Sequence, residues 1–270
     1  MLERAHGWVD AVARAPGIRA WLDARDARRF ASNRSDNLFR GVFASFEEAN
    51  ASAPPGLPRG YDSDAAALMY RDRLRRLFPT DYPVLFWLQG LLAQGAATIF
   101  DLGGHIGLSY YAWEDALPLP SRVRWTVCDV PAVVARGQAY ARHHDSRGHL
   151  AFTSNFADAD GADVLLAMGV LQYLPDTLAE RLGALRVKPR SILVNLTPLH
   201  SGRRYFTLQS IGTAYCPYRI ESEPDFLRDM HALGYSPRDT WINPDKACLI
   251  PWHPDESIRF YRGFHFARIA

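Results

Sequence analysis

The stretch Ile99-Phe100-Asp101-Leu102-Gly103-Gly104-His105-Ile106-Gly107 predicts a buried strand that ends near a carboxylate and enters a helix through a glycine-rich turn. Glycines there let a ligand approach the backbone closely, with the helix N-terminus behind it. A dinucleotide fingerprint reads G-x-G-x-x-G, whereas this stretch reads D-x-G-G-x-x-G. Because Asp101 would repel a pyrophosphate and attract an ammonium group, we expect an amino-acid-like ligand. The alternative is an ordinary tight turn.

A second apolar run, Trp125-Thr126-Val127-Cys128, is also followed by a carboxylate, Asp129. An acid at this place can accept both hydroxyls of a ribose with its two oxygens. It can also cap the helix that Pro131 opens. Together the two strands describe a pocket for a nucleoside joined to an amino acid.

From residue 97 onward, short apolar runs alternate with amphipathic segments, which is typical of βαβ units. We therefore predict a Rossmann-like, doubly wound, mostly parallel α/β sheet of seven strands. The predicted strands are Thr98–Leu102, Val123–Cys128, Leu150–Thr153, Asp163–Met168, Ser191–Leu196, Ser236–Trp241 and Ile258–Ile269. The predicted helices between and after them are Leu108–Leu117, Pro131–His143, Asp176–Leu185 and Pro224–Leu233.

Residues 1–95 show no strand-like alternation of any length, and we interpret them as a helical N-terminal extension that caps the sheet domain. Helices are predicted near Asp64–Leu77 and Pro83–Ala93. The segment Ser45-Phe46-Glu47-Glu48 has the pattern of a capping box at a helix start.

The composition excludes several classes of protein. The net charge is only +2 in 270 residues, and the arginines are interspersed with acidic residues along the chain, so we predict no nucleic-acid partner. Three distant cysteines, Cys128, Cys216 and Cys248, argue against a disulfide framework or a structural zinc site, and we expect no metal and a cytoplasmic location. The most apolar window, Pro83–Phe100, is too interrupted to span a membrane. The oligomeric state stays open, a homodimer included.

These motifs resemble the class I S-adenosylmethionine-dependent methyltransferases from about Ala97 to the carboxyl end. Asp101, Gly103 and Gly107 match that family's first motif, Asp129 matches its ribose-binding acid, and His105 replaces the usual middle glycine. The resemblance implies S-adenosylmethionine as cofactor, a methyltransferase domain over residues 96–270 and an antiparallel final strand.

Two further resemblances concern the acceptor. The segments 129–134 and 163–176 look like those of small-molecule O-methyltransferases. Other segments resemble a largely uncharacterised bacterial group of methyltransferases, some linked to cell-surface polysaccharide synthesis. They imply O- or N-methylation of a small-molecule or saccharide acceptor, without identifying it. The segments of the second group are Phe39–Phe43, Gly60–Asp62, Thr207–Gln209, Cys216–Tyr218 and Tyr261–Phe264.

The candidate site residues follow from these placements. We expect Gly104 in the turn, Ser154 and Asn155 after the third strand and Met168 at the end of the fourth to contact the cofactor. The long polar insertion Tyr205–Arg219 either forms an acceptor pocket or lid, or is a structural loop packed by its own aromatics. The candidate acceptor-binding residues are Gln172, Tyr173, Gln209, Tyr215, Tyr218 and Arg219.

Two histidines are candidates for a general base. His105 lies in the turn itself, where it either acts on the substrate or bonds to backbone, and His200 follows the fifth strand at the ligand-binding edge of the sheet. The O-methyltransferases often carry a histidine base where this chain has Gln172, which cannot take a proton at neutral pH. Their phenol-type mechanism therefore does not carry over.

Two other hypotheses remain. One is a methyltransferase-like protein that binds a nucleoside or a partner without catalysis, which Gln172 and His105 favour. The other is a nucleotide-sugar or nicotinamide enzyme, against which Asp101 argues.

Overall fold

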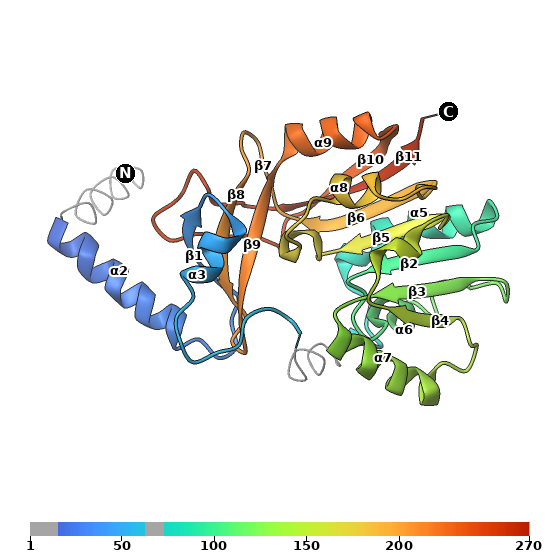
Figure 1. Cartoon of the computed structure of the whole chain (residues 1–270), viewed down its shortest axis with the longest axis horizontal. Helices are drawn as coiled ribbons and strands as arrows, with labels where there is room; N and C mark the ends of the chain where they lie inside the picture. Colours follow the sequence, from blue (N-terminus) through green and yellow to red (C-terminus); the bar gives the residue numbers. More distant parts are fainter. Residues whose placement is uncertain (1–15, 63–72, 270) are drawn as a thin grey trace, which may run out of the picture.

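The computed structural model describes residues 16–62 and 73–269, which form two sheets surrounded by helices (Figure 1). The larger sheet has the strand order β10-β11-β6-β5-β2-β3-β4, and β11 runs antiparallel to both of its neighbours. The predicted seven-stranded, mostly parallel sheet with an antiparallel final strand is therefore confirmed. Its strands are β2 (Thr98–Leu102), β3 (Arg124–Cys128), β4 (Leu150–Thr153), β5 (Val164–Met168), β6 (Ser191–Thr197), β10 (Tyr235–Asn243) and β11 (Tyr261–Arg268).

Helices cover both faces of this sheet because alternate strand residues point to opposite sides. On β2, Phe100 and Leu102 join the core formed with α8 and α9, whereas Ile99 joins the core formed with α5 and α6. The helices are α5 (Tyr82–Ala93), α6 (Leu108–Ala112), α7 (Pro131–His144), α8 (Leu178–Gly183) and α9 (Glu223–Ala232), with short 3₁₀ helices η2 (Pro79–Asp81), η3 (Phe156–Ala159) and η4 (Leu171–Tyr173).

The smaller sheet was not predicted. Its strands are β1 (Leu38–Phe43), β8 (Tyr205–Ser210), β9 (Tyr215–Ser222) and β7 (Leu199–His200), in the order β1-β8-β9-β7. The expectation that residues before 96 contain no strand is wrong, because β1 pairs antiparallel with β8, a partner more than 160 residues away along the chain. The insertion Tyr205–Arg219 is accordingly a hairpin rather than a loop.

The N-terminal extension is otherwise helical where it is described, with α2 (Pro16–Ala31) and α3 (Phe46–Ala51). Ser45 accepts the Glu48 N–H at 3.1 Å, as the capping box predicts. The Glu48 carboxylate instead accepts the Ala44 N–H, one residue before the cap. The helix predicted near Asp64–Leu77 lies largely outside the described residues.

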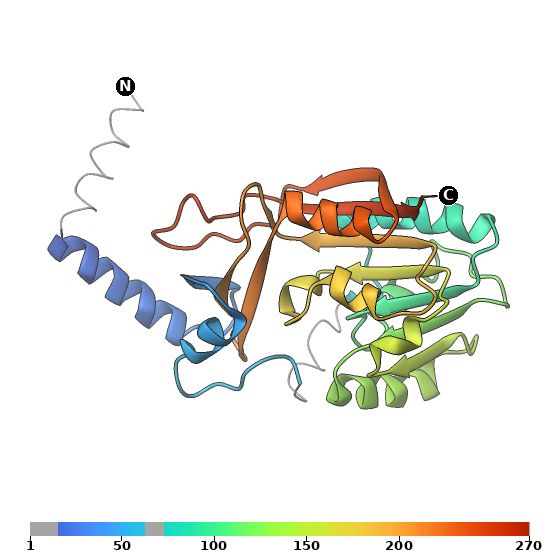
Figure 2. The same cartoon turned by 45° about the horizontal axis from the view of Figure 1, so that its top comes forward.

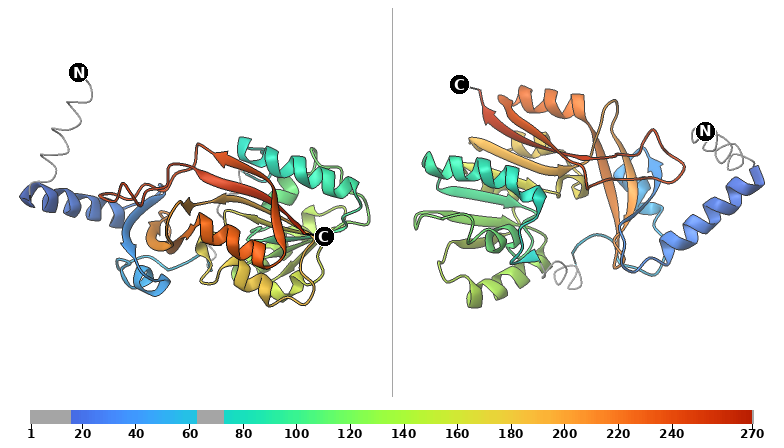
Figure 3. Two further views of the ribbon diagram at one scale, coloured as in Figure 1. Left: turned by 90° about the horizontal axis from the view of Figure 1, so that it is seen from above. Right: turned by 180° about the vertical axis from the view of Figure 1, so that it is seen from behind.

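The parallel strands of the large sheet point their carboxyl ends toward the smaller sheet (Figure 1). Turning the molecule shows α2 extending away from both sheets (Figure 2), and the views from above and behind show the same separation (Figure 3). The edge predicted to bind ligands thus faces the smaller sheet. Among the described residues no helix has an apolar run long enough to cross a bilayer.

Candidate cofactor and acceptor site

The glycine-rich turn adopts the backbone that its composition predicts. Gly103 and Gly107 have left-handed φ angles of +72° and +94°, and His105 between them has +56°. A left-handed conformation is costly for a residue with a side chain, although histidine tolerates it better than most. His105 therefore holds a left-handed backbone that a glycine would adopt without steric cost.

Asp101 lies beneath this turn. Its side chain points to the Ile99 face of β2, is 1% exposed, and accepts a hydrogen bond from the Trp125 indole Nε1 at 3.1 Å. A Cβ atom on Gly104 would lie 2.4 Å from the Asp101 Oδ2, so only glycine fits above the carboxyl group. Burial raises the pKa of Asp101 to about 7; the Trp125 N–H opposes the shift, and the charge of Asp129 adds to it.

Asp129 ties the glycine turn to the end of β3. Its Oδ2 accepts the His105 N–H at 2.9 Å, and its Oδ1 accepts the Val130 N–H at 2.8 Å. Burial raises the pKa of Asp129, and these two backbone donors oppose the shift. Each carboxylate oxygen has two lone pairs, so both can accept one more hydrogen bond.

Asp62, and not Asp129, caps the start of α7. The Asp62 Oδ1 accepts the N–H of Ala132 in the first turn of α7 at 3.1 Å. Asp62 belongs to the segment Gly60–Asp62, which therefore crosses from the smaller sheet to the start of α7. Asp129 instead accepts a hydrogen bond from the glycine-rich turn, through the His105 N–H.

A small cavity of about 80 Å³ opens beside the turn. Asp101, Gly103, Gly104 and Met168 line it together with Ser109, whose hydroxyl lies 3.8 Å from the Met168 sulfur, whereas Gly107 and Asp129 do not line it. No pattern in the sequence indicated the residues on its other side. They are Arg73, Arg76 and Phe78. The guanidinium carbon of Arg73 lies 4.6 Å from the Phe78 ring centroid, and that of Arg76 lies 4.9 Å from it.

Ser154 and Asn155 lie next to Asp129 but do not line this cavity. The Asp129 N–H donates to the Thr153 carbonyl at 3.1 Å, which brings the ends of β3 and β4 together. The Asn155 Oδ1 accepts the Ala157 N–H and so caps η3. Both residues are exposed, and a ligand that continues past Asp129 would meet them.

Two of the residues predicted to bind an acceptor, Tyr173 and Gln209, are in contact, and Gln172 precedes Tyr173 in η4. Tyr173 in η4 donates to the Gln209 Oε1 of β8 at 2.9 Å, and Tyr61 donates to the Tyr173 hydroxyl at 3.3 Å. Gln172 donates through Nε2 to the Gly169 carbonyl. Its Oε1 is buried with no hydrogen-bond partner among the described residues.

The other three predicted acceptor residues lie inside the smaller sheet. The Tyr215 ring stacks on Phe30, and Tyr218 bonds to the Tyr261 hydroxyl at 2.8 Å. Arg219, 2% exposed, pairs with Glu221 at 2.6 Å. Its guanidinium also donates to three backbone carbonyls in and after η4, those of residues 171, 175 and 176. Arg219 thus fixes the segment that carries Gln172 and Tyr173.

The two candidate bases lie in different parts of the fold. His105 is buried in the turn. His200 lies on β7, where its Nδ1 accepts the Gly202 and Arg203 N–H groups and its Nε2 faces the Asp255 carbonyl at 3.1 Å. Since Nδ1 accepts hydrogen bonds, the ring proton is on Nε2, and the Nε2–H donates a hydrogen bond to the backbone carbonyl of Asp255. Both nitrogens of His200 therefore have structural partners.

No known family model matches this sequence, and none of the curated proteins matches it. Solved structures that resemble it include 1,6-didemethyltoxoflavin-N1-methyltransferase of Burkholderia thailandensis, with bound S-adenosylhomocysteine (17% identity, 78% of this chain and 84% of that chain, TM-score 0.47). Others are magnesium protoporphyrin IX methyltransferase from Synechocystis PCC 6803 (13%, 70% and 82%, 0.46) and mitomycin 7-O-methyltransferase (18%, 95% and 69%, 0.41).

At these identities and TM-scores, the likeness carries no information about activity. The strand order and the antiparallel β11 give the chain a Rossmann-like, mostly parallel α/β fold.

Proposed function

We propose that this protein is an S-adenosylmethionine-dependent methyltransferase that acts on a small-molecule or saccharide acceptor. One observation carries the proposal. A buried carboxyl group, Asp101, and a half-buried one, Asp129, flank a left-handed glycine turn, and Asp129 is joined to that turn through the His105 N–H. Such a pair suits a ligand with a cationic amino-acid end and a ribose.

The residues present fit such a cofactor. Asp101 would hold the ammonium group, and the positive charge of that group would stabilise the carboxylate that burial disfavours. Asp129 would accept the ribose hydroxyls. The guanidinium of Arg76, at the cavity mouth, would pair with the cofactor carboxylate. A cavity of about 80 Å³ is smaller than most ligand pockets, so the exposed Arg76 side chain would have to shift outward on binding while its guanidinium stays within reach of the cofactor carboxylate.

The bound cofactor would supply an electrophilic methyl group, which an acceptor oxygen or nitrogen takes by direct displacement. The protein's part is to hold the acceptor in line with the methyl group, and positioning alone can lower such a barrier by roughly 7–11 kcal/mol. Gln172 Oε1, which has no hydrogen-bond partner among the described residues, would accept a hydrogen bond from the acceptor, and Tyr173 of η4 and Gln209 of β8 would also bind it. His105 stays the candidate base, since His200 is engaged in its loop.

The test is isothermal titration of the intact chain with S-adenosylhomocysteine. We expect saturable binding, and a loss of at least about 100-fold in affinity in Asp129→Ala, because that change removes the ribose acceptor and the anchor of the His105 N–H. Asp115→Ala, an exposed carboxylate elsewhere, serves as the matched control. Unchanged affinity in a folded Asp129→Ala would refute the ribose assignment.

A second measurement separates a catalyst from a nucleoside-binding protein that has lost activity. A catalyst consumes S-adenosylmethionine when small-molecule and saccharide acceptors are supplied, whereas a binding protein holds the donor without turnover. Failure of NAD and UDP-sugars to raise the melting temperature would count against the nucleotide-sugar and nicotinamide alternatives.

A further inference from the structure

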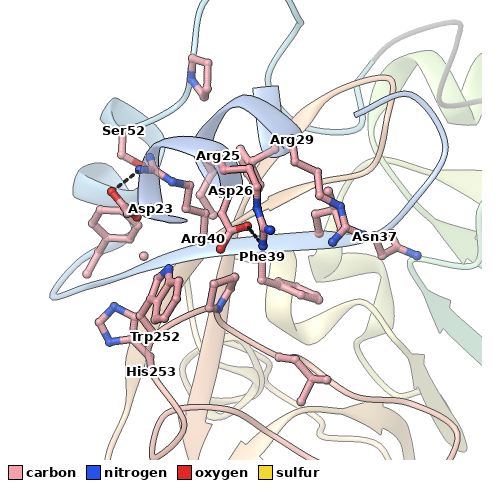
Figure 4. A pocket seen from close by; sticks show the side chains of 18 of the residues that line it. Asp23, Arg25, Asp26, Arg29, Asn37, Phe39, Arg40, Ser52, Trp252 and His253 are labelled. Atoms are coloured by element: carbon pink, nitrogen blue, oxygen red, sulfur yellow. Dashed lines mark hydrogen bonds and ion pairs between the residues drawn. The ribbon is translucent and has the colours of Figure 1, made fainter. Parts of the chain in front are cut away.

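A second and much larger cavity lies away from the glycine turn, between α2, β1 and the segment 247–253 (Figure 4). Its volume is about 1110 Å³, slightly above the usual range of about 300–1,000 Å³ for small-molecule sites. None of its lining residues belongs to the glycine turn, to β3 or to η4. It is therefore distinct from the glycine-turn site, although Asn37 in its lining accepts a hydrogen bond from the Gln209 Nε2 at 3.1 Å.

The lining is cationic with acceptors interspersed. Arg19, Arg25, Arg29 and Arg40 contribute four positive charges, and Asp23 and Asp26 contribute two negative charges, so the balance is +2 before His253 is considered. Arg40 pairs with Asp23 at 3.5 Å and Arg25 with Asp26 at 3.4 Å. Two guanidinium groups, those of Arg19 and Arg29, have no carboxylate partner among the described residues.

Two buried donors in this lining lack an acceptor. The Arg40 Nε–H and the Trp252 indole N–H are buried and have no hydrogen-bond partner within the described ranges. Unpaired buried donors are rare and costly, so each calls for an acceptor. Trp252 also holds a left-handed φ of +68°, a strain that often marks ligand-binding positions.

The walls and the acceptors narrow the kind of ligand. The rings of Trp252, Phe39 and Phe43 offer flat apolar surfaces, and the Arg19 guanidinium lies 4.9 Å from the Trp252 ring centroid. Carboxylates and an amide, at Asp23, Asp26 and Asn37, can accept hydroxyl groups. A ring with hydroxyls and an anionic substituent matches all three features.

We infer that this cavity binds an anionic sugar, in which a phosphate or carboxylate group meets the arginines and the indole N–H while a ring face lies on the aromatic wall. The anion accepts hydrogen bonds from Arg40 Nε and Trp252 Nε1. Asp23 and Asp26 accept the sugar hydroxyls. The site does not require the proposed methyl transfer, so either assignment can fail alone.

Titration of the full chain with glucose 6-phosphate and with glucuronate tests the inference and separates the two sources of negative charge. We expect at least one of them to saturate, and to bind about 10-fold more tightly than either neutral glucose or inorganic phosphate. Arg29→Ala and Trp252→Phe should each weaken that binding by about 10-fold, the second because it keeps an aromatic ring but removes the donor. Arg142→Ala, an exposed arginine on α7, should leave it unchanged.

All three variants should keep a cooperative thermal unfolding transition, which shows that they are folded whether or not S-adenosylhomocysteine binds. Any affinity for S-adenosylhomocysteine should also be the same in all three, because the two sites are independent. Absence of saturable binding by both sugars would overturn the inference. So would binding that persists in Arg29→Ala and Trp252→Phe, or inorganic phosphate binding as tightly as the better sugar. An equal loss in Arg142→Ala would indicate a general charge effect and also refute it.

Discussion

The two sheets of this protein differ in how far apart their parts lie in the chain. In the large sheet the central strands follow one another through short helices, and the glycine turn joins β2 directly to α6. In the smaller sheet β1 must find β8 across more than 160 residues. The first sheet supplies the proposed cofactor contacts and the second supplies Gln209 and the arginine that holds η4. The residues proposed to bind the cofactor are thus positioned by short stretches of sequence, whereas those proposed to bind the acceptor are positioned by pairing between distant strands.

The junction between the sheets should be the most sensitive to a single change. Arg219→Ala leaves the buried Glu221 carboxylate without its cation and removes donors from three carbonyls in and after η4. We expect the free energy of unfolding to fall by about 3–5 kcal/mol. Denaturant unfolding measures this, with Arg228→Ala on the surface of α9 as control. A loss of unfolding free energy no larger than that of the control would show that the contacts of Arg219 with Glu221 and η4 do not hold the two sheets together.

Within the large sheet, Gly104→Ala should cost less but act on the cofactor site. The new Cβ would lie 2.4 Å from a buried carboxyl oxygen, which has little room to move. Overpacking of this kind costs about 1–3 kcal/mol. We expect that loss in unfolding experiments together with weaker binding of S-adenosylhomocysteine. Gly183→Ala in α8, where nothing lies within 4 Å of the new atom, should change neither quantity.

Asp101→Asn should change stability in the opposite sense, raising it, and by an amount that depends on pH. The folded pKa of Asp101, about 7, lies above the ordinary value of 3.8, so ionisation destabilises the fold as the pH rises through this window. Asparagine removes that penalty and can still accept the Trp125 N–H. We expect the melting temperature to rise by about 3 °C or more at pH 8 and to be unchanged at pH 4.

Ligand binding should respond to Asp101 in the opposite sense. A cationic ligand favours the ionised carboxylate, so the affinity of the natural chain should increase between pH 5.5 and pH 7.5, whereas that of Asp101→Asn should be low and flat. A variant that binds as well as the natural chain at pH 7.5 would remove Asp101 from the cofactor site.

The same contrast explains what could be predicted from the sequence. The glycine turn, the two acids and the strands around them are encoded within short stretches, so the order of residues alone was enough to place them. The helix capping of α7 by Asp62, the cavity lining by Arg73 and Arg76 and the burial of Arg219 depend on contacts between distant segments. Hydrophobic periodicity carries no information about such contacts, and β1 was missed for the same reason.

The most direct test is a crystal structure of the intact chain soaked with S-adenosylhomocysteine. The account predicts density along the glycine turn, with the ribose hydroxyls on Asp129, the ammonium group on Asp101 and the Arg76 side chain displaced. Clear density for the compound elsewhere, with Asp101 still bonded only to Trp125 and Asp129 only to the two backbone N–H groups, would contradict it.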